Sequence, residues 1–387
     1  MSLVLTTNYS SLVAQDSLST SGGELSTALQ QLSSGLRINT AADDAAGYAI
    51  VQGMTAQING LDQASQNAND GVSLAQTAQG ALTEITNDLQ TMRDLAVESL
   101  NATNSSQDRA DLNQQFSQLQ ADINNVASTA AFNGVNLLDG SFQGATFQVG
   151  ANIGQTISVS SVASANTSAL GTLYTAKGAA PAGAMTAGDT GTVTIAGVTT
   201  AAFTVTGVAA TDAKTVAAAI NAISAQDGGV VATVNATNGI DLSSTTSPTV
   251  TVTVNAVTGA SVTAGNVGLA GGATAITANK TNLNVGNVNT VDGSNLALAQ
   301  IDAALQQVAA TGAQLGAYQN RFQSAITGLN TDSTNLQSAR SGIQDTDYAM
   351  ATSQLSKAQI LQQASTAMVA QANTIPQNIL TLLQKLP

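Results

Sequence analysis

Two pairs of carboxylates are the residues in this sequence whose types and spacing could do chemistry. Asp43 adjoins Asp44, and Asp345 lies two residues before Asp347. Paired carboxylic acids can work as a general acid and a general base. Each pair, however, flanks a predicted start or bend of a helix, where an acid stabilises the positive end of the helix dipole or faces solvent. We therefore interpret both pairs as structural.

Other residue types that are common in catalytic sites are absent from the sequence, or do not occur in the motifs that such sites require. The chain has no histidine and no cysteine, which removes zinc sites, thiol nucleophiles and Ser–His nucleophiles. Ala270-Gly271-Gly272 lacks the Lys-Ser/Thr of a phosphate-binding loop, so it predicts a turn. Matches to the N-glycan acceptor pattern, among them Asn101-Ala102-Thr103, Asn104-Ser105-Ser106, Asn166-Thr167-Ser168 and Asn235-Ala236-Thr237, are attributed to chance in so Asn- and Thr-rich a chain. The sequence thus predicts no enzyme activity, no metal and no cofactor.

Composition narrows the class of protein further. The chain has 387 residues, enough for two or three domains. Only 9% of its residues are charged, yet the net charge is −13, and residues 1–165, with 14 acids and three arginines, carry most of it. No basic patch is visible, so we expect no nucleic-acid partner. The lack of cysteine rules out a disulfide framework and suits a chain that is exported unfolded.

The sequence contains no secretion or membrane signal of the usual kind. Residues 1–15 carry no basic residue and no long apolar core, so they do not predict a cleaved secretory signal. No run of about 18 apolar residues occurs, so we expect no membrane partner and no spanning helix. An extracellular protein with this sequence would leave the cell by a route that needs no cleaved signal.

The chain is organised around a long helix predicted over residues 58–96. Its seam positions recur in steps of three and four, which is typical of a helix that packs against other helices. Burying its large apolar side chains gives roughly 1.5–3 kcal/mol each, whereas ordering the backbone costs about 1–2 kcal/mol per residue, so the helix needs a partner. The seam comprises Ile58, Leu61, Ser65, Ala68, Val72, Ala75, Gln79, Leu82, Ile85, Leu89, Met92 and Ala96.

The best partner lies near the other end of the sequence. Residues 298–343 carry a seam of the same period and similar length, from Leu298 to Ile343. Thr40 and Asp43 are the expected N-cap residues of the long helix. Further helices are predicted over residues 1–35, 112–126 and 349–373. The two ends of the chain must therefore meet, with the middle projecting.

The middle of the chain changes period. Residues 142–149 and 156–162 alternate and predict a β-hairpin region. Residues 166–285 are rich in Thr, Val, Ala and Gly, with strands expected at 192–195, 202–206, 230–234, 240–242 and 250–254 and a helix at 211–225. A disordered linker is the alternative, and the periodic Val and Ile argue against it. We predict a mainly α fold: a long antiparallel helical bundle or coiled coil formed by both termini, with an inserted β-rich outer domain.

Long motifs at both ends resemble bacterial flagellin. The N-terminal motifs are Leu32-Ser33-Ser34-Gly35-Leu36-Arg37-Ile38-Asn39, Asp43-Asp44-Ala45-Ala46-Gly47 and the stretch Asn67 to Gln76. The C-terminal motifs are Gly316 to Phe322, Ser338 to Ile343 with Asp345 to Tyr348, Ala358 to Ala364 and Pro376-Gln377-Asn378-Ile379-Leu380. The resemblance covers about residues 1–165 and 290–387.

The resemblance implies a subunit of the flagellar filament, a helical homopolymer that acts as the propeller for swimming. It implies export by the flagellar type III apparatus to the extracellular side, with an export chaperone, a cap and hook-junction proteins as partners. Residues 1–45 and 347–387 would be filament-core helices, 46–165 and 286–346 a helical outer-core layer with the β-hairpin region, and 166–285 a variable surface domain. The expected assembly residues are Leu32, Leu36, Arg37, Ile38, Asn39, Ile360, Leu361, Pro376, Ile379 and Leu380.

The family also carries a surface that an innate immune receptor recognises, which the resemblance places at Leu89, Arg93 and Leu95. Recognised members usually have an arginine where this chain has Thr91 and a glutamate where it has Gln115. Weak receptor binding and a purely structural role both remain open for this stretch.

Three alternatives are weighed against a filament subunit. The hook–filament junction protein of the same machine has similar ends, but the fuller C-terminal motif favours flagellin. A protease carried in the insert would need His-Glu-x-x-His, which a chain without histidine cannot supply. A carbohydrate-binding insert is disfavoured, because five tyrosines and no tryptophan give little surface for sugar stacking.

Overall fold

The structure is a computed structural model that describes residues 8–226, 229–244, 249–259, 261–269, 275–277 and 279–384, without the side chains of 249–250, 275–277, 279 and 375–384. The chain divides into two compact units. The first unit contains the residues up to Ala68, Gln148–Thr156 and those from Ser324 onward, and the second contains Asn69–Phe147 and Ile157–Gln323. Within the described residues, no helix combines the length and apolarity needed to cross a membrane.

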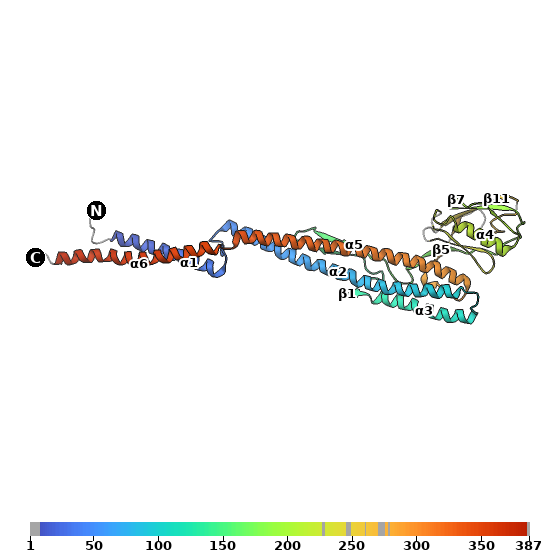
Figure 1. The fold of residues 1–387 in the computed structure, drawn as a ribbon, viewed down its shortest axis with the longest axis horizontal. Coiled ribbons are helices and arrows are strands. Elements are labelled where there is room, and N and C mark those ends of the chain that lie inside the picture. Colours follow the sequence, from blue (N-terminus) through green and yellow to red (C-terminus); the bar gives the residue numbers. More distant parts are fainter. Residues whose placement is uncertain are drawn as a thin grey trace. The chain divides into compact units, whose positions relative to one another are not determined.

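The terminal helices of the first unit pair with each other. Helix α1 (Tyr9–Ser34) lies beside α6 (Tyr348–Gln384), as Figure 1 shows. At one end Asn8 Nδ2 donates to the carbonyl of Ala372 at 2.8 Å, and at the other the N–H of Thr346 donates to the carbonyl of Gly35 at 2.9 Å. These two hydrogen bonds show that the pair is antiparallel.

The first unit also holds the start of α2 (Ala45–Ser99) and the end of α5 (Val291–Gln344). Leu61 and Ala64 of α2 form a small core with Leu329 of α5. Ala151, from the turn between β3 (Ala145–Gln148) and β4 (Thr156–Val159), packs on the same core. Ser333 Oγ donates to Asp62 at 3.2 Å, which adds a polar contact between the two helices.

The second unit combines the remaining parts of α2 and α5 with α3 (Ser106–Thr129). Gln319 Nε2 donates to Gln79 Oε1 at 2.7 Å, and Ser294 Oγ donates to Ser99 Oγ at 3.0 Å, so α2 and α5 are antiparallel. The long helix and its distant partner are therefore confirmed. Their apolar core fully buries large side chains from all three helices, including Ile85, Leu89, Met92, Phe116, Ile123 and Phe322.

Two short hairpins follow α3 in the chain. Strands β1 (Ala131–Phe132) and β2 (Val135–Asn136) form the first, with Asn133 and Gly134 at positive φ in its turn. Strands β3 (Ala145–Gln148) and β4 (Thr156–Val159) form the second. The predicted hairpin region is thus present, with shorter strands than expected.

The inserted region folds around two antiparallel sheets and one helix, α4 (Ala209–Asn221). One sheet has the order β13-β5-β10-β9, and the other has the order β12-β11-β6-β7, with β8 pairing with β6. The strands are β5 (Leu173–Ala176), β6 (Thr190–Ile195), β7 (Val198–Thr199), β8 (Phe203–Thr204), β9 (Val231–Val234), β10 (Ile240–Ser244), β11 (Thr249–Thr258), β12 (Ala275–Thr277) and β13 (Asn279–Thr281).

This region has its own core, to which Val193, Phe203, Val216, Ile220 and Val252 contribute. The β-rich insert is therefore confirmed, and the alternative of a disordered linker is wrong for the described part of this region. Strands β5, β7, β12 and β13, of two to four residues each, were not predicted.

The expected N-cap of the long helix is wrong. Helix α2 begins at Ala45, and Asp44 Oδ1 accepts the N–H of Gly47 at 2.9 Å, so Asp44 is the capping residue rather than Thr40 or Asp43. Asp43 instead accepts the N–H groups of Asn39 and Thr40 at 3.0 and 2.8 Å. These hydrogen bonds, that from Thr40 foremost, lower the pKa of Asp43.

Candidate assembly surface

The seam between α1 and α6 is built mainly from small side chains. Its residues on α1 are Ser11, Ala14, Leu18, Ser21, Leu25, Ala28 and Leu32, and those on α6 are Ala351, Leu355, Ala358, Gln362, Ser365, Val369 and Ala372. Both sets recur in alternating steps of three and four, the spacing of a coiled coil. Every buried member is Ala or Ser. The two helices can therefore approach closely while burying little apolar area.

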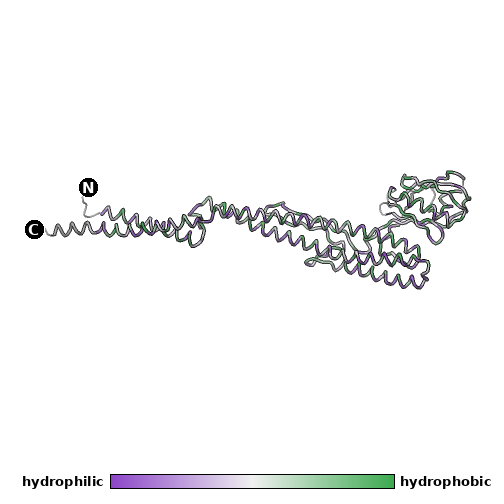
Figure 2. Tube along the Cα trace, viewed as in Figure 1, coloured by the Kyte–Doolittle hydropathy of each residue, from purple (hydrophilic) through white to green (hydrophobic). Residues whose placement is uncertain are grey.

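Most large apolar side chains of the same two helices face away from the seam, although Leu18, Leu25, Leu32, Leu355 and Val369 lie half-buried in it. Half of the 18 exposed large hydrophobic residues in the described part of the chain lie on α1 and α6: Tyr9, Leu12, Val13, Leu29, Tyr348, Met350, Ile360, Leu361 and Met368. Figure 2 shows apolar and polar residues intermixed along both helices. An exposed apolar surface of this kind marks a site for another protein surface.

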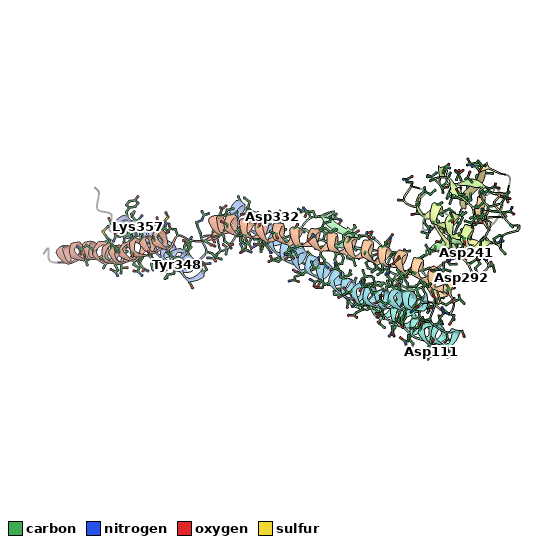
Figure 3. All side chains as sticks on the ribbon, turned by 45° about the vertical axis from the view of Figure 1, so that its right-hand side comes forward. Asp111, Asp241, Asp292, Asp332, Tyr348 and Lys357 are labelled. Atoms are coloured by element: carbon green, nitrogen blue, oxygen red, sulfur yellow. The ribbon has the colours of Figure 1, made fainter. Side chains whose placement is uncertain are left out.

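Charged side chains are scarce on this helix pair. Over residues 9–34 and 348–384 the sequence has only Asp16, Glu24 and Lys357. Figure 3 labels Lys357 on α6, together with Tyr348 near the start of that helix. The three charged residues are exposed. A surface with so few charges can meet a second copy of itself without strong repulsion.

The loop between α1 and α2 is fastened to the junction of α5 and α6. Arg37 N–H donates to the carbonyl of Gln344 at 2.6 Å, and its guanidinium Nη2 donates to the carbonyl of Ile343. These carbonyls belong to the last turn of α5, where backbone acceptors have no partner within the helix and a positive charge is favoured. Arg37 thus caps a helix that lies about three hundred residues later in the sequence.

The residues that follow Arg37 in the sequence also hold this loop in place, and we call the segment Leu36–Asn39 with its contacts to the end of α5 the joint. Ile38 is buried, and Asn39 Nδ2 donates to Ser34 Oγ at 2.8 Å, which holds the loop against the end of α1. A Cβ on Gly47 would lie 2.7 Å from Ile38 Cδ1, so glycine is needed to admit the Ile38 side chain. The motif from Leu36 to Gly47 therefore encodes a fixed turn between helices.

The C-terminal motif from Gly316 to Phe322 holds the second unit together. Tyr318 OH accepts the N–H of Ser160 at 3.1 Å and shares a hydrogen bond with its Oγ at 2.7 Å, and these bonds lower the pKa of Tyr318. Phe322 packs where a Cβ on Gly71 would lie 2.5 Å from its ring. The Phe322 ring also meets Phe147 edge-on, with centroids 5.2 Å apart.

The three residues expected at an immune-receptor surface have different surroundings. Leu89 and Leu95 are buried in the helical core of the second unit. The exposed Arg93 donates from Nε to Asp302 Oδ1 at 2.8 Å, an ion pair between α2 and α5. Its guanidinium pKa is raised by this hydrogen bond and by the charge of Asp302. Arg93 alone of the three presents a side chain to solvent.

The expected assembly residues also divide into groups. Ile360 and Leu361 are exposed on α6, and Leu32 lies half-buried in the seam. Leu36, Arg37, Ile38 and Asn39 form the joint described above. The side chains of Pro376, Ile379 and Leu380 lie outside the described residues, although the backbone of α6 continues to Gln384.

Sequence reasoning missed several members of the exposed apolar set. Tyr9, Val13 and Met350 were not singled out, because they do not continue a seam and so leave no periodic signal. Their common property, a large apolar residue off the seam of a heptad helix, is readable from the sequence once the seam is known. Among the described residues, no three or more acids gather into a group that could hold a metal ion.

Comparison with known proteins agrees with the motifs. Residues 5–143 match the family described as bacterial flagellin N-terminal helical region, and residues 298–383 match the bacterial flagellin C-terminal helical region. Flagellin B of Vibrio anguillarum is 39% identical over 393 residues, which cover 99% of this chain and 100% of that protein.

Two solved structures are also similar. FliC from Burkholderia pseudomallei is 27% identical with a TM-score of 0.40, and the match covers 65% of this chain and 99% of that one. The flagellar junction protein FlgL from Legionella pneumophila is 15% identical with a TM-score of 0.41, over 77% of this chain and 100% of that one.

The helical fold and the uncovered apolar face of its terminal helices define a structural subunit. The two family matches and the full-length relative then show the family, and the chain belongs to the bacterial flagellins. Its function is that of a structural subunit of the bacterial flagellar filament. Members of this family assemble into the extracellular filament, and the junction-protein alternative is the weaker one because the full-length relative is a flagellin.

Proposed function

We propose that the outward apolar residues of α1 and α6 are the contacts through which copies of this chain join into the filament. The observation that carries the proposal is that Ala and Ser occupy the buried positions of the seam, whereas nine large apolar side chains of the same two helices are exposed. Each large side chain covered by a neighbouring copy gives roughly 1.5–3 kcal/mol. Nine such side chains per copy add to the free energy that the seam provides, because the buried positions of the seam are Ala and Ser.

The proposal assigns roles to the expected residues. Ile360 and Leu361 contact a neighbouring copy, whereas Leu32 helps to hold α1 on α6. Leu36, Arg37, Ile38 and Asn39 are positioning residues, because they fix the turn from which the helix pair departs. Pro376, Ile379 and Leu380 extend the apolar face toward the end of α6, on the strength of the sequence alone.

The same reasoning supports a division into three layers. Residues 1–45 and 347–387 form the filament core, because their apolar side chains need cover from other copies. Residues 46–165 and 286–346 form the surrounding helical layer, which buries its own large side chains. Residues 166–285 form the outer surface domain, and their separate core supports that role.

Substitution of one outward residue tests the assembly contact. Ile360→Glu places a charge on the proposed interface, and Gln363→Glu places the same charge on an exposed polar position one turn away. We expect Ile360→Glu to slow seeded filament elongation by about tenfold or more, equivalent to about 1.4 kcal/mol or more, and Gln363→Glu to have a smaller effect. Light scattering and electron microscopy measure elongation, and circular dichroism checks the fold. Normal elongation of Ile360→Glu would sink the proposal.

Family membership also supports a set of partners within the flagellar machine. We infer that the chain leaves the cell through the flagellar type III apparatus and meets an export chaperone, the filament cap and hook-junction proteins. The expected result is that the protein accumulates inside cells whose flagellar export gate is inactivated, while the Sec route remains intact. Unchanged secretion in such cells would contradict this route.

A weak interaction with an innate immune receptor is a second candidate function. Arg93 supports it, because this side chain is exposed on the expected stretch. Leu89 and Leu95 lie in the core and would act only by shaping the helix. We expect Arg93→Ala to reduce the response of a receptor reporter cell line at equal monomer concentration, with Asp302→Ala as the control that breaks the ion pair but keeps the arginine. No response from either the wild type or the variants would leave the stretch with a structural role only.

A further inference from the structure

The methionines of this chain divide sharply by burial. In the part that the structure describes, Met92 is fully buried, Met185 is 6% exposed and Met54 is half-buried. Met350 and Met368, both on α6, are instead 61% and 66% exposed. Methionine ordinarily fills gaps in cores, so two such side chains left in water need an explanation. They belong to the surface at which we place assembly, so the inference about them rests on that proposed function.

Their positions on α6 place both methionines beside the seam. Met350 directly precedes the seam residue Ala351, and Met368 directly precedes Val369. Met368 also follows Leu361 by seven residues, or two turns, so the two side chains share one face of the helix. A neighbouring copy that covers Leu361 would therefore cover the sulfur of Met368 as well.

Composition makes the thioether the main target of a mild oxidant in this protein. The chain has no cysteine, no tryptophan and no histidine. These side chains would otherwise compete for the oxidant, and cysteine thiolate would react before methionine. The oxidant must also reach the sulfur atom. Exposure and composition together therefore direct oxidation to Met350 and Met368.

We propose that Met350 and Met368 form a modification site at which a peroxide converts the free subunit into a form that cannot assemble. The thioether sulfur attacks one peroxide oxygen, the O–O bond breaks, and the sulfur retains that oxygen as a sulfoxide. The sulfur loses two electrons, and the peroxide is reduced to water or, from an alkyl hydroperoxide, to an alcohol. The sulfoxide is polar and chiral, so its burial in an apolar contact is unfavourable.

Assembly decides which copies are sensitive. In the free subunit both sulfurs are open to solvent, whereas in a filament the contact that uses Leu361 and Met368 covers them. A completed filament therefore resists the oxidant that disables the free subunit. Met92 and Met185 stay reduced in both forms and report on any loss of the fold.

The test follows each methionine separately. Free subunits and intact filaments are treated with hydrogen peroxide, and peptide mass spectrometry measures the sulfoxide at every methionine. In free subunits we expect Met350 and Met368 to oxidise before Met92 and Met185, and elongation from untreated seeds to fall by about tenfold or more with an unchanged circular dichroism spectrum. In filaments we expect both residues to be protected. Treatment with methionine sulfoxide reductases should restore elongation of the oxidised subunits.

Two variants isolate the sulfur atoms. Met350→Leu/Met368→Leu keeps apolar side chains of similar volume and removes the oxidisable atoms. We expect this variant to elongate like the wild type and to keep its rate after peroxide. Met54→Leu is the matched control, because it removes a half-buried sulfur on α2 and should leave the sensitivity unchanged.

The outcomes separate this inference from the assembly proposal. Oxidised wild-type subunits that elongate at the untreated rate would overturn the inference, and so would a double leucine variant that is as sensitive as the wild type. Lack of recovery after reductase treatment would also count against it, whether or not the variants fold. Failure of the assembly proposal has a different signature, namely normal elongation of Ile360→Glu without any oxidant.

Discussion

Two helical regions of this chain share one period and use their apolar residues in opposite ways. The α1–α6 pair has Ala and Ser at its buried seam positions and large apolar side chains outside. In the second unit, α2, α3 and α5 bury their largest side chains completely, as at Leu89, Phe116 and Phe322. Apolar area covered within the chain stabilises the free subunit, whereas area left outside contributes only when a copy covers it.

This difference shows which part of the chain buries its large apolar side chains without a second copy. The period of a seam predicts that helices pair, but the size of the seam residues decides how much stability the pairing provides. The helical core of the second unit needs no other copy to bury its side chains. The terminal pair leaves nine large apolar side chains exposed, which is the basis of the proposal that another copy covers them on assembly.

The largest effect is expected from a substitution in the core of the second unit. Phe322→Ala removes a ring that packs on Gly71 and meets Phe147 edge-on, and should lower the free energy of unfolding by about 3–5 kcal/mol. Ile360→Ala, on the terminal pair, should change it by no more than about 0.5 kcal/mol. Urea denaturation of the free subunits measures both. Equal decreases in the free energy of unfolding for the two variants would show that the two regions do not differ in this way.

Two glycines within α2 sharpen the comparison at the level of single atoms. A Cβ on Gly71 would lie 2.5 Å from the Phe322 ring, so Gly71→Ala should destabilise the subunit by about 1–3 kcal/mol. A Cβ on Gly80 would meet nothing within 4 Å, so Gly80→Ala should stabilise it by about 0.5–1 kcal/mol. Thermal unfolding followed at the helical signal gives both signs. A stabilising Gly71→Ala would mean that the ring is not held against that helix.

The joint that carries the terminal pair should respond more weakly. Arg37→Ala removes the donor that caps the end of α5 and should cost about 1 kcal/mol. Limited proteolysis should then cut the loop between α1 and α2 faster than in the wild type. Arg37→Lys retains the positive charge with a single donor nitrogen, so its cleavage rate should lie between those of the wild type and Arg37→Ala. Equal cleavage rates for all three proteins would show that the arginine does not hold the loop.

The smallest expected effect is a pH dependence in the helical core. Burial, and then the charges of Asp122 and Glu84, raise the pKa of Asp88. A carboxyl with a raised folded pKa opposes folding when it is ionised, so its penalty is present at neutral pH and fades as the pH falls through the folded pKa. Asp88→Asn should therefore stabilise the subunit at pH 7, by no more than about 0.5 kcal/mol, and have no effect in acid.

Asp108 provides the control of opposite sign. Hydrogen bonds from Ser105 at the start of α3, the backbone N–H first, lower the pKa of Asp108. Its contribution is therefore present above the unfolded pKa and is lost as the pH falls through the folded pKa. Asp108→Asn should weaken the subunit at neutral pH, where Asp88→Asn strengthens it. Parallel pH profiles for the two variants would contradict both assignments.

Much of the fold was predictable because its signals are local. The three-four steps of the long helix and of its partner recur over many turns, so no single residue had to be interpreted alone. The insert was recognised as β-rich, but its strands β5, β7, β12 and β13 were not found. Ile360 and Leu361 are exposed on α6 and their assembly role stays a prediction, whereas the outward Met350 was missed because it continues no pattern.

The sequence by itself determined the helical seams, the change of period in the middle of the chain and the membership of the family. Each of these features depends on residues that are close together in the sequence. Only the tertiary structure decided what the motif residues do. Arg37 donates a hydrogen bond to the carbonyl of Ile343. The Phe322 ring occupies the space that a Cβ on Gly71 would fill. Asp44 rather than Asp43 caps α2. Such roles depend on atoms that folding brings together from distant parts of the chain. Periodicity along the sequence does not predict which of these atoms are in contact.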